Sequence, residues 1–353
     1  MSRNKFLKIT KYLRFDEKST RTDRAGSDKF CMIRELWDKF IENSQACYRP
    51  NQHLTVDEQL LSSKNRCSFI QYIPSKPDKF GIKFWLIVEV VTKYILNGFP
   101  YLGKDSERSS NQLFGEYVVE KLVEPYKNKG YCVTCDNYFT SLSLVENLVK
   151  IKTTLIGTIR KNKRELQSLV KSKQKLHESL FFEDKKGCAL TIYQGRPEKK
   201  GILLSSFHEK VTTIPNDEKK MSKIIDSYNK KKVGVDLVNS MTKTYSVKCK
   251  TRRWPVVVFF NLVNMAAINS WVLYKQCNNT RISRRLYLIG LAQEILAQSQ
   301  AQETTPKTPT TPSRKRSASN NSELTPSSSK KVKVDERKKC QIRKCNQHKS
   351  NLT

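Results

Sequence analysis

One stretch of residues constrains the fold of this chain more than any other: Tyr131-Cys-Val-Thr-Cys-Asp-Asn-Tyr-Phe-Thr-Ser141. Apolar and β-favouring residues fill its first half, and Asp136 and Asn137 then end the run with side chains that prefer turns. The pattern predicts a buried strand that stops on an acid, so that a carboxylate is held rigidly beside a cleft. An alternative interpretation is that Asp136 caps the helix that the apolar spacing of residues 141–149 predicts.

Two other acids lie in similar contexts. Asp57 lies in the strand-like run 54–61, and Asp236 follows Val233-Gly-Val near a predicted helix start. The three acids are 79 (136 − 57) and 100 (236 − 136) residues apart, so that only folding could bring them together. Hard divalent cations such as Mg²⁺ take oxygen ligands, and a few carboxylates suffice beside substrate phosphates. Two such ions about 4 Å apart can activate a nucleophile and stabilise the leaving oxygen in phosphodiester chemistry.

The remaining patterns predict a mixed α/β fold. The predicted elements are helices within 6–13, 30–41, 116–122 and 142–148, a charged loop at 21–28, strands at 54–61, 68–73, 83–91, 93–96 and 154–159, and turns at 74–78 and Asn97-Gly98. Consecutive strands indicate antiparallel pairs, and the later strand–helix–strand order indicates parallel ones. We therefore expect a mixed sheet, antiparallel first and parallel later, with flanking helices.

The composition changes twice further along the chain. Residues 161–222 are rich in lysine and hold two short strand-like runs, at 189–193 and 202–206, which predicts an inserted subdomain. Past about residue 300 the chain is mostly Ser, Thr, Pro, Lys and Gln, which predicts a disordered basic tail. Within it, residues 314–316 and 330–333 resemble nuclear-import clusters, although a solvated run of charge would look similar.

The chain is strongly basic, with a formal net charge of +33. The tail from residue 301 onward holds 13 Lys and Arg against 4 Asp and Glu, a surplus of 9, which leaves 24 (33 − 9) for residues 1–300. Such a charge opposes compaction and indicates a polyanionic partner, either nucleic acid or an anionic membrane surface. We favour nucleic acid; the remaining alternative is a solvated basic surface that binds nothing specific.

Ten cysteines occur without a secretory signal at the polar N-terminus, which indicates reduced thiols in an intracellular protein. Cys132 and Cys135 form a CxxC motif. In a strand, however, positions i and i+3 point to opposite faces, so that we do not expect them to share a metal ion.

The segment 254–274 is apolar and long enough to span a membrane. Its three asparagines, Asn261, Asn264 and Asn269, would be costly in hydrocarbon. Pro255 suits the first turn of a helix. We therefore expect a buried core helix and no membrane partner.

A set of short motifs runs in one order from near residue 1 to about residue 275. They are Thr55-Val-Asp-Glu-Gln-Leu, Tyr72-Ile-Pro-Ser-Lys-Pro with Phe80-Gly-Ile-Lys83, Thr92-Lys-Tyr94 with Asn97-Gly98 and Pro100-Tyr-Leu-Gly103, Cys135-Asp-Asn-Tyr-Phe-Thr-Ser141, Gly157-Thr-Ile-Arg-Lys-Asn-Lys-Arg-Glu165, Gly234-Val-Asp236, Arg253-Trp-Pro255 and Ile268-Asn-Ser270. Each motif alone is weak, but in this order they make the chain resemble the piggyBac transposase family.

This resemblance implies an RNase H-like fold, interrupted by an insertion domain, in which three carboxylates bind two Mg²⁺ or Mn²⁺ ions. Position by position, Asp57, Asp136 and Asp236 match those acids. The implied reaction is cut-and-paste DNA transposition: water cuts beside the element end, the freed 3′-hydroxyl attacks the opposite strand, the hairpin is reopened, and the ends join a TTAA target. The implied partners are double-stranded DNA and a second copy of the chain, in the nucleus.

Near the third acid, some residues match the family pattern and others depart from it. Arg252, Arg253 and Trp254 match an Arg/Lys-Trp-Pro motif of the family, which implies that the tryptophan packs beside the site or stacks on DNA; we favour packing. Family members commonly carry a further Asp where this chain has Asn239, whose amide oxygen could still bind a metal but adds no charge. Val233 replaces a usual Gly.

Both ends also depart from the family, so that the resemblance implies a chain truncated at each. The implied domains are a remnant of the N-terminal helical dimerisation and DNA-binding domain (1–50), the catalytic domain in two parts (51–160 and 223–280) around the insertion (161–222), a helical extension (281–300) and the basic tail (301–353). The tail offers only Cys340, Cys345 and His348 where the family has a zinc domain built from several Cys pairs. An unstructured tail is favoured, and zinc is not expected.

The sequence therefore leaves three functional hypotheses. The intact acids favour a DDE-type DNA transposase, whereas Asn239 and the expected truncation favour a domesticated or decaying derivative that binds DNA without catalysis. A non-specific basic chromatin or RNA binder would leave the ordered motifs unexplained.

Overall fold

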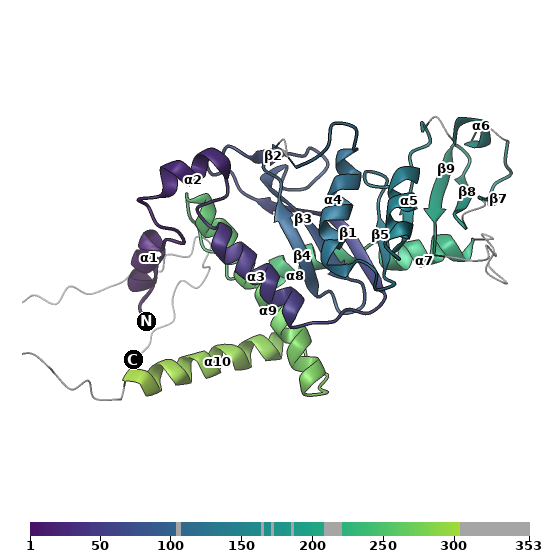
Figure 1. Ribbon diagram of the computed structural model, residues 1–353. Coiled ribbons are helices and arrows are strands. Elements are labelled where there is room, and N and C mark those ends of the chain that lie inside the picture. Colours follow the sequence, from purple (N-terminus) through teal and green to yellow (C-terminus); the bar gives the residue numbers. More distant parts are fainter. Residues whose placement is uncertain (104–106, 164–165, 171–172, 185–186, 208–220, 304–353) are drawn as a thin grey trace, which may run out of the picture. The chain divides into compact units, whose positions relative to one another are not determined.

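The computed structural model describes residues 1–303 apart from 104–106, 164–165, 171–172, 185–186 and 208–220 (Figure 1). The chain divides into a unit of Met1–Ser299 and a second unit of Gln300–Thr353. Of the second unit, only residues 300–303 are described, as the end of a helix. The predicted basic tail from 304 onward therefore lies outside the described residues, as do Cys340, Cys345 and His348.

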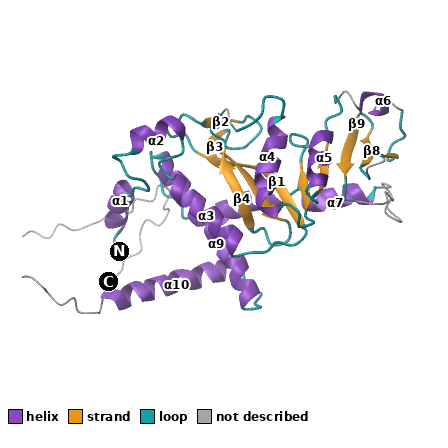
Figure 2. Ribbon diagram, in the orientation of Figure 1, coloured by secondary structure: helices purple, strands orange, loops and turns teal. Residues whose placement is uncertain are grey.

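The described elements begin with three helices and end with four, and the strands lie between them with further helices interspersed (Figures 1 and 2). The helices are α1 (Arg3–Tyr12), α2 (Arg21–Ser27), α3 (Arg34–Ala46), α4 (Phe114–Val123), the short η1 (Glu124–Tyr126), α5 (Leu142–Lys150), α6 (Gln167–Val170), α7 (Lys223–Lys231), α8 (Gly234–Thr244), α9 (Trp254–Cys277) and α10 (Arg284–Glu303). The strands are β1 (His53–Ser62), β2 (Ile70–Tyr72), β3 (Phe80–Glu89), β4 (Ile95–Pro100), β5 (Cys132–Cys135), β6 (Thr154–Thr158), β7 (Ser179–Glu183), β8 (Ala189–Arg196) and β9 (Lys199–Ser205).

All of these strands join one mixed sheet. Its order is β2-β3-β1-β5-β6-β9-β8-β7, and β4 pairs with β3. The pairs β1–β5 and β5–β6 are parallel, and the other pairs are antiparallel. The structure thus confirms the expected mixed sheet with flanking helices, and α5 is the crossover between the parallel strands β5 and β6.

The two faces of the sheet bury different sets of helices. Alternate residues of β1, Leu54 and Val56, pack in a core with α4 and α5. On the other face, the β3 residues Phe84 and Leu86 pack against α8 and α9, and Cys132 on β5 packs against α7. Because side chains of a strand alternate between faces, this division assigns each polar residue of β1 and β5 to one side.

Two local predictions were wrong. The residues predicted as a charged loop at 21–28 form α2, which has no buried residue and is held by ion pairs from Arg21 and Arg24 to Asp16 at 2.7 and 3.3 Å. A helix without an apolar face leaves no periodic signal in the sequence. The predicted turn at Asn97-Gly98 instead lies within β4, where Gly98 pairs with Leu86.

The segment predicted as an inserted subdomain contributes strands to the main sheet. Within 161–222, β7, β8 and β9 form an antiparallel meander, and β9 pairs with β6. The two strand-like runs correspond to β8 and β9, whereas β7 was not predicted. Residues 208–220 of this segment lie outside the described residues, and the domain boundaries stay predictions.

The long apolar segment forms α9, with Pro255 in its first turn. Among the described residues, α9 is the helix that is long and apolar enough to cross a membrane, but most of its apolar window is buried. Its asparagines bond to the rest of the chain: Asn261 donates to Gln59 Oε1 at 2.7 Å, and Asn269 donates to the Ile95 carbonyl at 2.9 Å. These contacts identify α9 as a core helix.

Candidate active site at the β1–β5 edge

The parallel register of β1 and β5 places two of the predicted acids side by side. Thr55 stands opposite Thr134, an offset of 79 residues. Asp57 and Asp136 differ by the same 79, so that the two acids are level on neighbouring strands, whose backbones lie about 4.8 Å apart. Because Leu54 and Val56 face the other way, Asp57 faces the side of the sheet covered by α7, α8 and α9. The register carries Asp136 to the same side.

Asp136 does not cap the helix that follows it. Ser141 does so instead, since its Oγ accepts a hydrogen bond from Leu144 N at 3.1 Å. Asp136 closes a tight turn of its own: Oδ1 accepts from Tyr138 N at 2.8 Å, and its carbonyl accepts from Thr140 Oγ1 at 2.8 Å. The carboxylate is therefore held at the strand end by its own turn.

The carboxyl of Asp57 has a strongly perturbed affinity for protons. Burial, together with the negative charges of Glu58 and Asp136, raises the pKa of Asp57 to about 8. Burial also raises the pKa of Asp136, against the effects of the Tyr138 N–H and of Arg160. Two neighbouring half-buried carboxylates thus resist carrying full negative charge together, and a bound cation would relieve that cost.

Two lysines partly balance these acids. Burial works to raise the pKa of Glu58, but Lys83 and Lys76 outweigh it and lower that pKa. Lys76 Nζ lies 3.0 Å from Glu58 Oε1. Burial lowers the pKa of Lys83, while Glu58, Asp57 and Asp136 oppose that shift. The site therefore mixes acids with partly buried cations.

Asp236 reaches the same region from α8. It lies in the first turn of that helix and is exposed to solvent. The start of α8 is tied to β1, because Thr55 Oγ1 donates to the Lys231 carbonyl at 2.6 Å, just before the helix begins. Asp236 acts on Lys76, whose pKa is raised by Glu58, Asp57 and Asp236 against the effect of burial. Lys76 thus lies within electrostatic reach of Asp57 on β1 and Asp236 on α8.

Asn239 lies one turn further along α8. Its Oδ1 accepts a hydrogen bond from Gln59 Nε2 at 3.0 Å, and its Nδ2 donates to the Glu58 carbonyl at 3.3 Å. Gln59 in turn accepts from Asn261 on α9. These three amides form a chain that fastens α8 and α9 to β1, and the predicted metal-ligand role of Asn239 stays a prediction.

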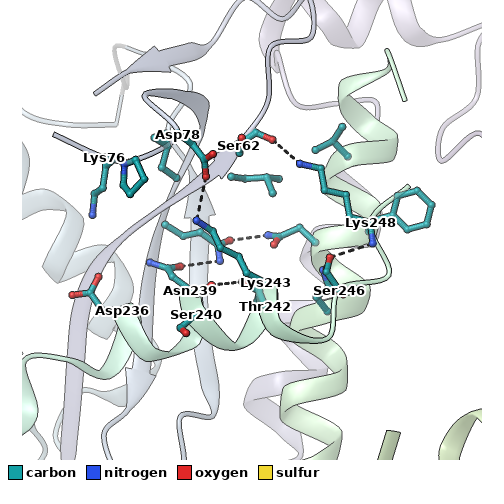
Figure 3. A pocket seen from close by; sticks show the side chains of 18 residues that line it. Ser62, Lys76, Asp78, Asp236, Asn239, Ser240, Thr242, Lys243, Ser246 and Lys248 are labelled. Atoms are coloured by element: carbon teal, nitrogen blue, oxygen red, sulfur yellow. Dashed lines mark hydrogen bonds and ion pairs between the residues drawn. The ribbon is translucent and has the colours of Figure 1, made fainter. Parts of the chain in front are cut away.

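A pocket of about 400 Å³ opens beside Asp236 (Figure 3). Residues of β1, the 76–78 turn, α8 and α9 line it. Figure 3 shows Asp236 and Lys76 at one end and Lys248 at the other, with Lys243 bonded to Asp78 at 3.1 Å. The lining is therefore rich in amines and amides, which suits phosphate oxygens.

The Arg-Trp-Pro motif serves the core. Trp254 stacks on Phe30 with ring centroids 5.7 Å apart and meets Phe69 edge-on at 5.1 Å. Arg253 Nη1 donates to the Lys11 carbonyl at 3.2 Å, whereas Arg252 is exposed. The favoured interpretation of Trp254 as a packing residue agrees with these contacts, and DNA binding by the two arginines stays a prediction.

The CxxC cysteines point to opposite faces, as expected. Cys132 packs in the cluster under α7, and Cys135 packs with α4 and α5. Burial raises the pKa of the Cys132 thiol to about 11, so that it remains protonated.

The donor set of Asp57 and Asp136 fits a hard divalent cation. Carboxylate oxygens are the ligands such ions prefer, and burial, with the charges of Glu58 and Asp136, raises the pKa of Asp57, so that a bound cation would favour its ionised form. Within the described residues, no three His, Cys, Asp or Glu side chains form a ready metal-ligand group. Asp236 is the third predicted acid, but in this structure its side chain does not form a ligand group with those of Asp57 and Asp136.

Three residues of the site were not singled out from the sequence. Glu58, Lys83 and Tyr138 all surround the two acids, through the interactions described above. Each lies within one of the motifs quoted from the sequence, so that the motifs held the signal. Lys83 was missed because the pairing of β3 with β1, not sequence distance, brings it to Glu58. Glu58 and Tyr138 lie within two residues of acids that the sequence did single out.

Comparison with known proteins agrees with this geometry. Residues 1–271 match the profile of the family described as Transposase IS4. Human PiggyBac transposable element-derived protein 3 is 27% identical over 271 residues, which cover 70% of this chain and 44% of that protein. Human PiggyBac transposable element-derived protein 2 is 22% identical over 299 residues, which cover 78% of this chain and 49% of that protein. The chain thus spans about half the length of these curated relatives.

A solved structure supports the same assignment. The cryo-EM structure of a piggyBac transposase synaptic complex with hairpin DNA superposes with a TM-score of 0.80 and 34% identity, over 87% of this chain and 66% of that one. This match confirms the fold that the resemblance implied, an RNase H-like mixed sheet with flanking helices. The profile, the relatives and the superposition together establish that the chain is a piggyBac-like member of the Transposase IS4 family.

Proposed function

We propose that this protein is a metal-dependent DNA transposase that cleaves DNA strands and joins them to a TTAA target. The observation that carries the proposal is the level placement of Asp57 and Asp136 on neighbouring parallel strands, with the pKa of Asp57 raised. A half-buried carboxylate pair of this kind suits Mg²⁺ or Mn²⁺, two ions of which would serve the reaction. Asp236, at the start of α8, would complete the ligand set.

The residues around the acids have defined tasks in this proposal. The Asp136 turn holds its carboxylate in place through the N–H of Tyr138. Lys76 and Lys83 offset the charge of Glu58, and would keep the acids from repelling the DNA phosphates. When bound, the metal ions would supply activation of the attacking oxygen and stabilisation of the leaving one.

The proposed partner is double-stranded DNA, including transposon ends. The net charge of +33 supports it, as does the likeness to a transposase solved with hairpin DNA. Two copies of the chain would act together, as the resemblance implies, and we propose the nucleus as the location. DNA affinity should fall steeply as salt rises, because neutralised phosphates release counterions. A flat salt response would contradict the DNA footprint.

The decisive experiment compares Mn²⁺-dependent nicking and strand transfer on plasmid DNA. Asp57→Ala and Asp136→Ala should each lower the rate by at least 100-fold. Asp226→Ala is the matched control, since Asp226 pairs with Lys230 on the surface of α7 at 2.6 Å. Nicking that survives both site substitutions would contradict the proposal.

The second candidate is a derivative that binds DNA without catalysis. The observation in its favour is Asn239, whose amide oxygen is engaged by Gln59 and which adds no negative charge to the site. In that case the wild-type protein would bind DNA with the same salt dependence and show no Mn²⁺-dependent nicking.

A further inference from the structure

Tyr138 stands beside the candidate metal ligands with part of its ring open to solvent. It follows Asp136 by two residues, and its N–H donates to that carboxylate. The residue is 42% exposed, whereas its neighbour Phe139 is 1% exposed. The turn therefore buries one aromatic ring and leaves the next half-exposed, two residues from Asp136.

The ring of Tyr138 is held in place from beneath. It stacks on Trp85 of β3 with centroids 5.7 Å apart and planes 14° from parallel. The Tyr138 carbonyl also lies against Gly115 of α4, where a Cβ would approach that oxygen to 2.5 Å. The sequence thus keeps Gly115 free of a side chain, which lets the helix clamp the turn. One face of the ring is covered and its orientation is fixed.

Cations flank this ring. Lys83 Nζ lies 3.8 Å from the centroid of the Trp85 ring and 5.5 Å from that of Tyr138. Arg160 Nε donates to the side-chain oxygen of Asn137, the residue that precedes Tyr138, at 3.5 Å. Positive groups beside a half-open aromatic face are the elements from which sites for unpaired nucleotides are built: the cations take the phosphates and the ring takes the base.

We propose that Tyr138 is a stacking platform for an unpaired base next to the phosphodiester held at Asp136. The inference rests on the proposed function, and adds that the substrate strand is locally unpaired at the reacting phosphate. Tyr138 is a positioning residue here: it would fix the nucleotide, while the acids act on the phosphate. Any base could stack, so that the contact would be tolerant of sequence.

The test uses duplex DNA with a single-stranded overhang that carries 2-aminopurine at the junction, without metal, so that no strand is cut. Wild-type protein should quench the 2-aminopurine fluorescence by stacking. Tyr138→Ala should abolish the quenching and weaken binding about tenfold, whereas Tyr138→Phe should keep both. Tyr138→Leu keeps bulk over Trp85 without an aromatic face, and should behave like Tyr138→Ala.

The matched control is Tyr274→Ala, because Tyr274 is also 42% exposed and packs against a second ring, that of Tyr287 at 5.1 Å. It should leave the quenching unchanged. Equal quenching by wild type and Tyr138→Leu, or none by wild type, would overturn the proposal. The result is separable from catalysis: quenching that depends on Tyr138 without Asp136-dependent nicking would refute the transposase and keep the platform. Asp136-dependent nicking without Tyr138-dependent quenching would support the transposase and refute the stacking platform.

Discussion

Gln59 on β1 donates a hydrogen bond to Asn239 on α8 at 3.0 Å, and this contact ties the helix that carries Asp236 to the strand that carries Asp57. The position of the third acid relative to the first therefore depends on an amide pair. An amide suits this place, because Asn239 accepts from Gln59 and also donates to the Glu58 carbonyl. A carboxylate could make only the first of these bonds.

Asn239→Asp should therefore have two opposite effects. Without metal, the free energy of unfolding should fall by about 1–3 kcal/mol, because the Glu58 carbonyl loses its donor and faces a negative charge. Mn²⁺ affinity should rise, because charge is added one turn from Asp236. Calorimetric titration with Mn²⁺ measures the second effect, and Thr244→Asp, at an exposed residue two turns from Asp236 on α8, is the control of equal charge. Unchanged Mn²⁺ affinity would remove Asn239 from the predicted ligands.

The raised pKa of Asp57 makes stability depend on pH. The unfolded carboxyl loses its proton near pH 4, while the folded one keeps it to about pH 8, so that this residue's contribution is largest below pH 4 and is lost as pH rises to 8. Asp57→Asn should remove this pH dependence. Between pH 4 and pH 8, its free energy of unfolding should rise relative to that of wild type by up to about 1.4 kcal/mol per pH unit. Urea unfolding without metal at pH 5, 6, 7 and 8 checks this. Parallel curves for the two proteins would show that the carboxyl is not perturbed.

Gly157→Ala, on β6 beside β5, should disturb the turn that holds Asp136. A Cβ at this position would overlap Thr140 Oγ1, the group that donates to the Asp136 carbonyl, and would approach the Cys135 carbonyl to 3.0 Å. Overpacking of this kind costs about 1–3 kcal/mol, and nicking activity should fall with it. Adding Thr140→Ala should recover part of the stability. Gly290→Ala, inside α10 where a Cβ meets nothing within 4 Å, is the control and should not lower stability, because Ala favours a helix over Gly.

Trp254→Ala should lower the stability of the protein without lowering the DNA affinity of the folded variant. Its ring packs on Phe30 and Phe69, so that truncation should cost about 3 kcal/mol in thermal or urea unfolding. At a temperature where the variant remains folded, DNA affinity should stay within about twofold of wild type. Arg252→Ala, at the exposed neighbour, should instead leave stability unchanged and lower the salt slope of DNA binding by about one. A DNA defect in folded Trp254→Ala would restore the stacking interpretation.

Much of the fold could be predicted because its buried elements are marked by apolar residues in the sequence. The strand before Asp136 and the core helix α9 are nearly continuous apolar runs, and the helix α5 has helical apolar spacing. The exposed helix α2 has no such pattern and was missed. Asn97-Gly98 has the composition of a turn, but tertiary contacts decide its conformation: Trp37 Nε1 donates to the Gly98 carbonyl at 3.0 Å, in the middle of β4.

The candidate site could be predicted only in part. Strand ends and helix starts suggested the three acids, but the register that levels Asp57 with Asp136 is set by strand pairing. Sequence also could not choose between capping and catalysis for Asp136. Ser141 caps α5 and thereby excludes the capping role, while the catalytic role stays a proposal. The antiparallel pairing of β3 with β1 brings Lys83 close to the acids of β1, and this pairing could not be deduced from the sequence.

The asparagines of α9 have a consequence for the synthesis of the chain. Asn269 bonds both backbone groups of Ile95, and Asn264 accepts from Val247 N at 3.0 Å, so that α9 has one axial position and one rotation in which its amides are satisfied. The partners of α9 in β1 and β4, Gln59 and Ile95, precede Asn261 and Asn269 by 202 and 174 residues, so that they leave the ribosome well before α9 does. Until then the nascent sheet holds its inner face open, and an apolar surface larger than that of the finished protein is exposed to whatever chaperones attend the ribosome.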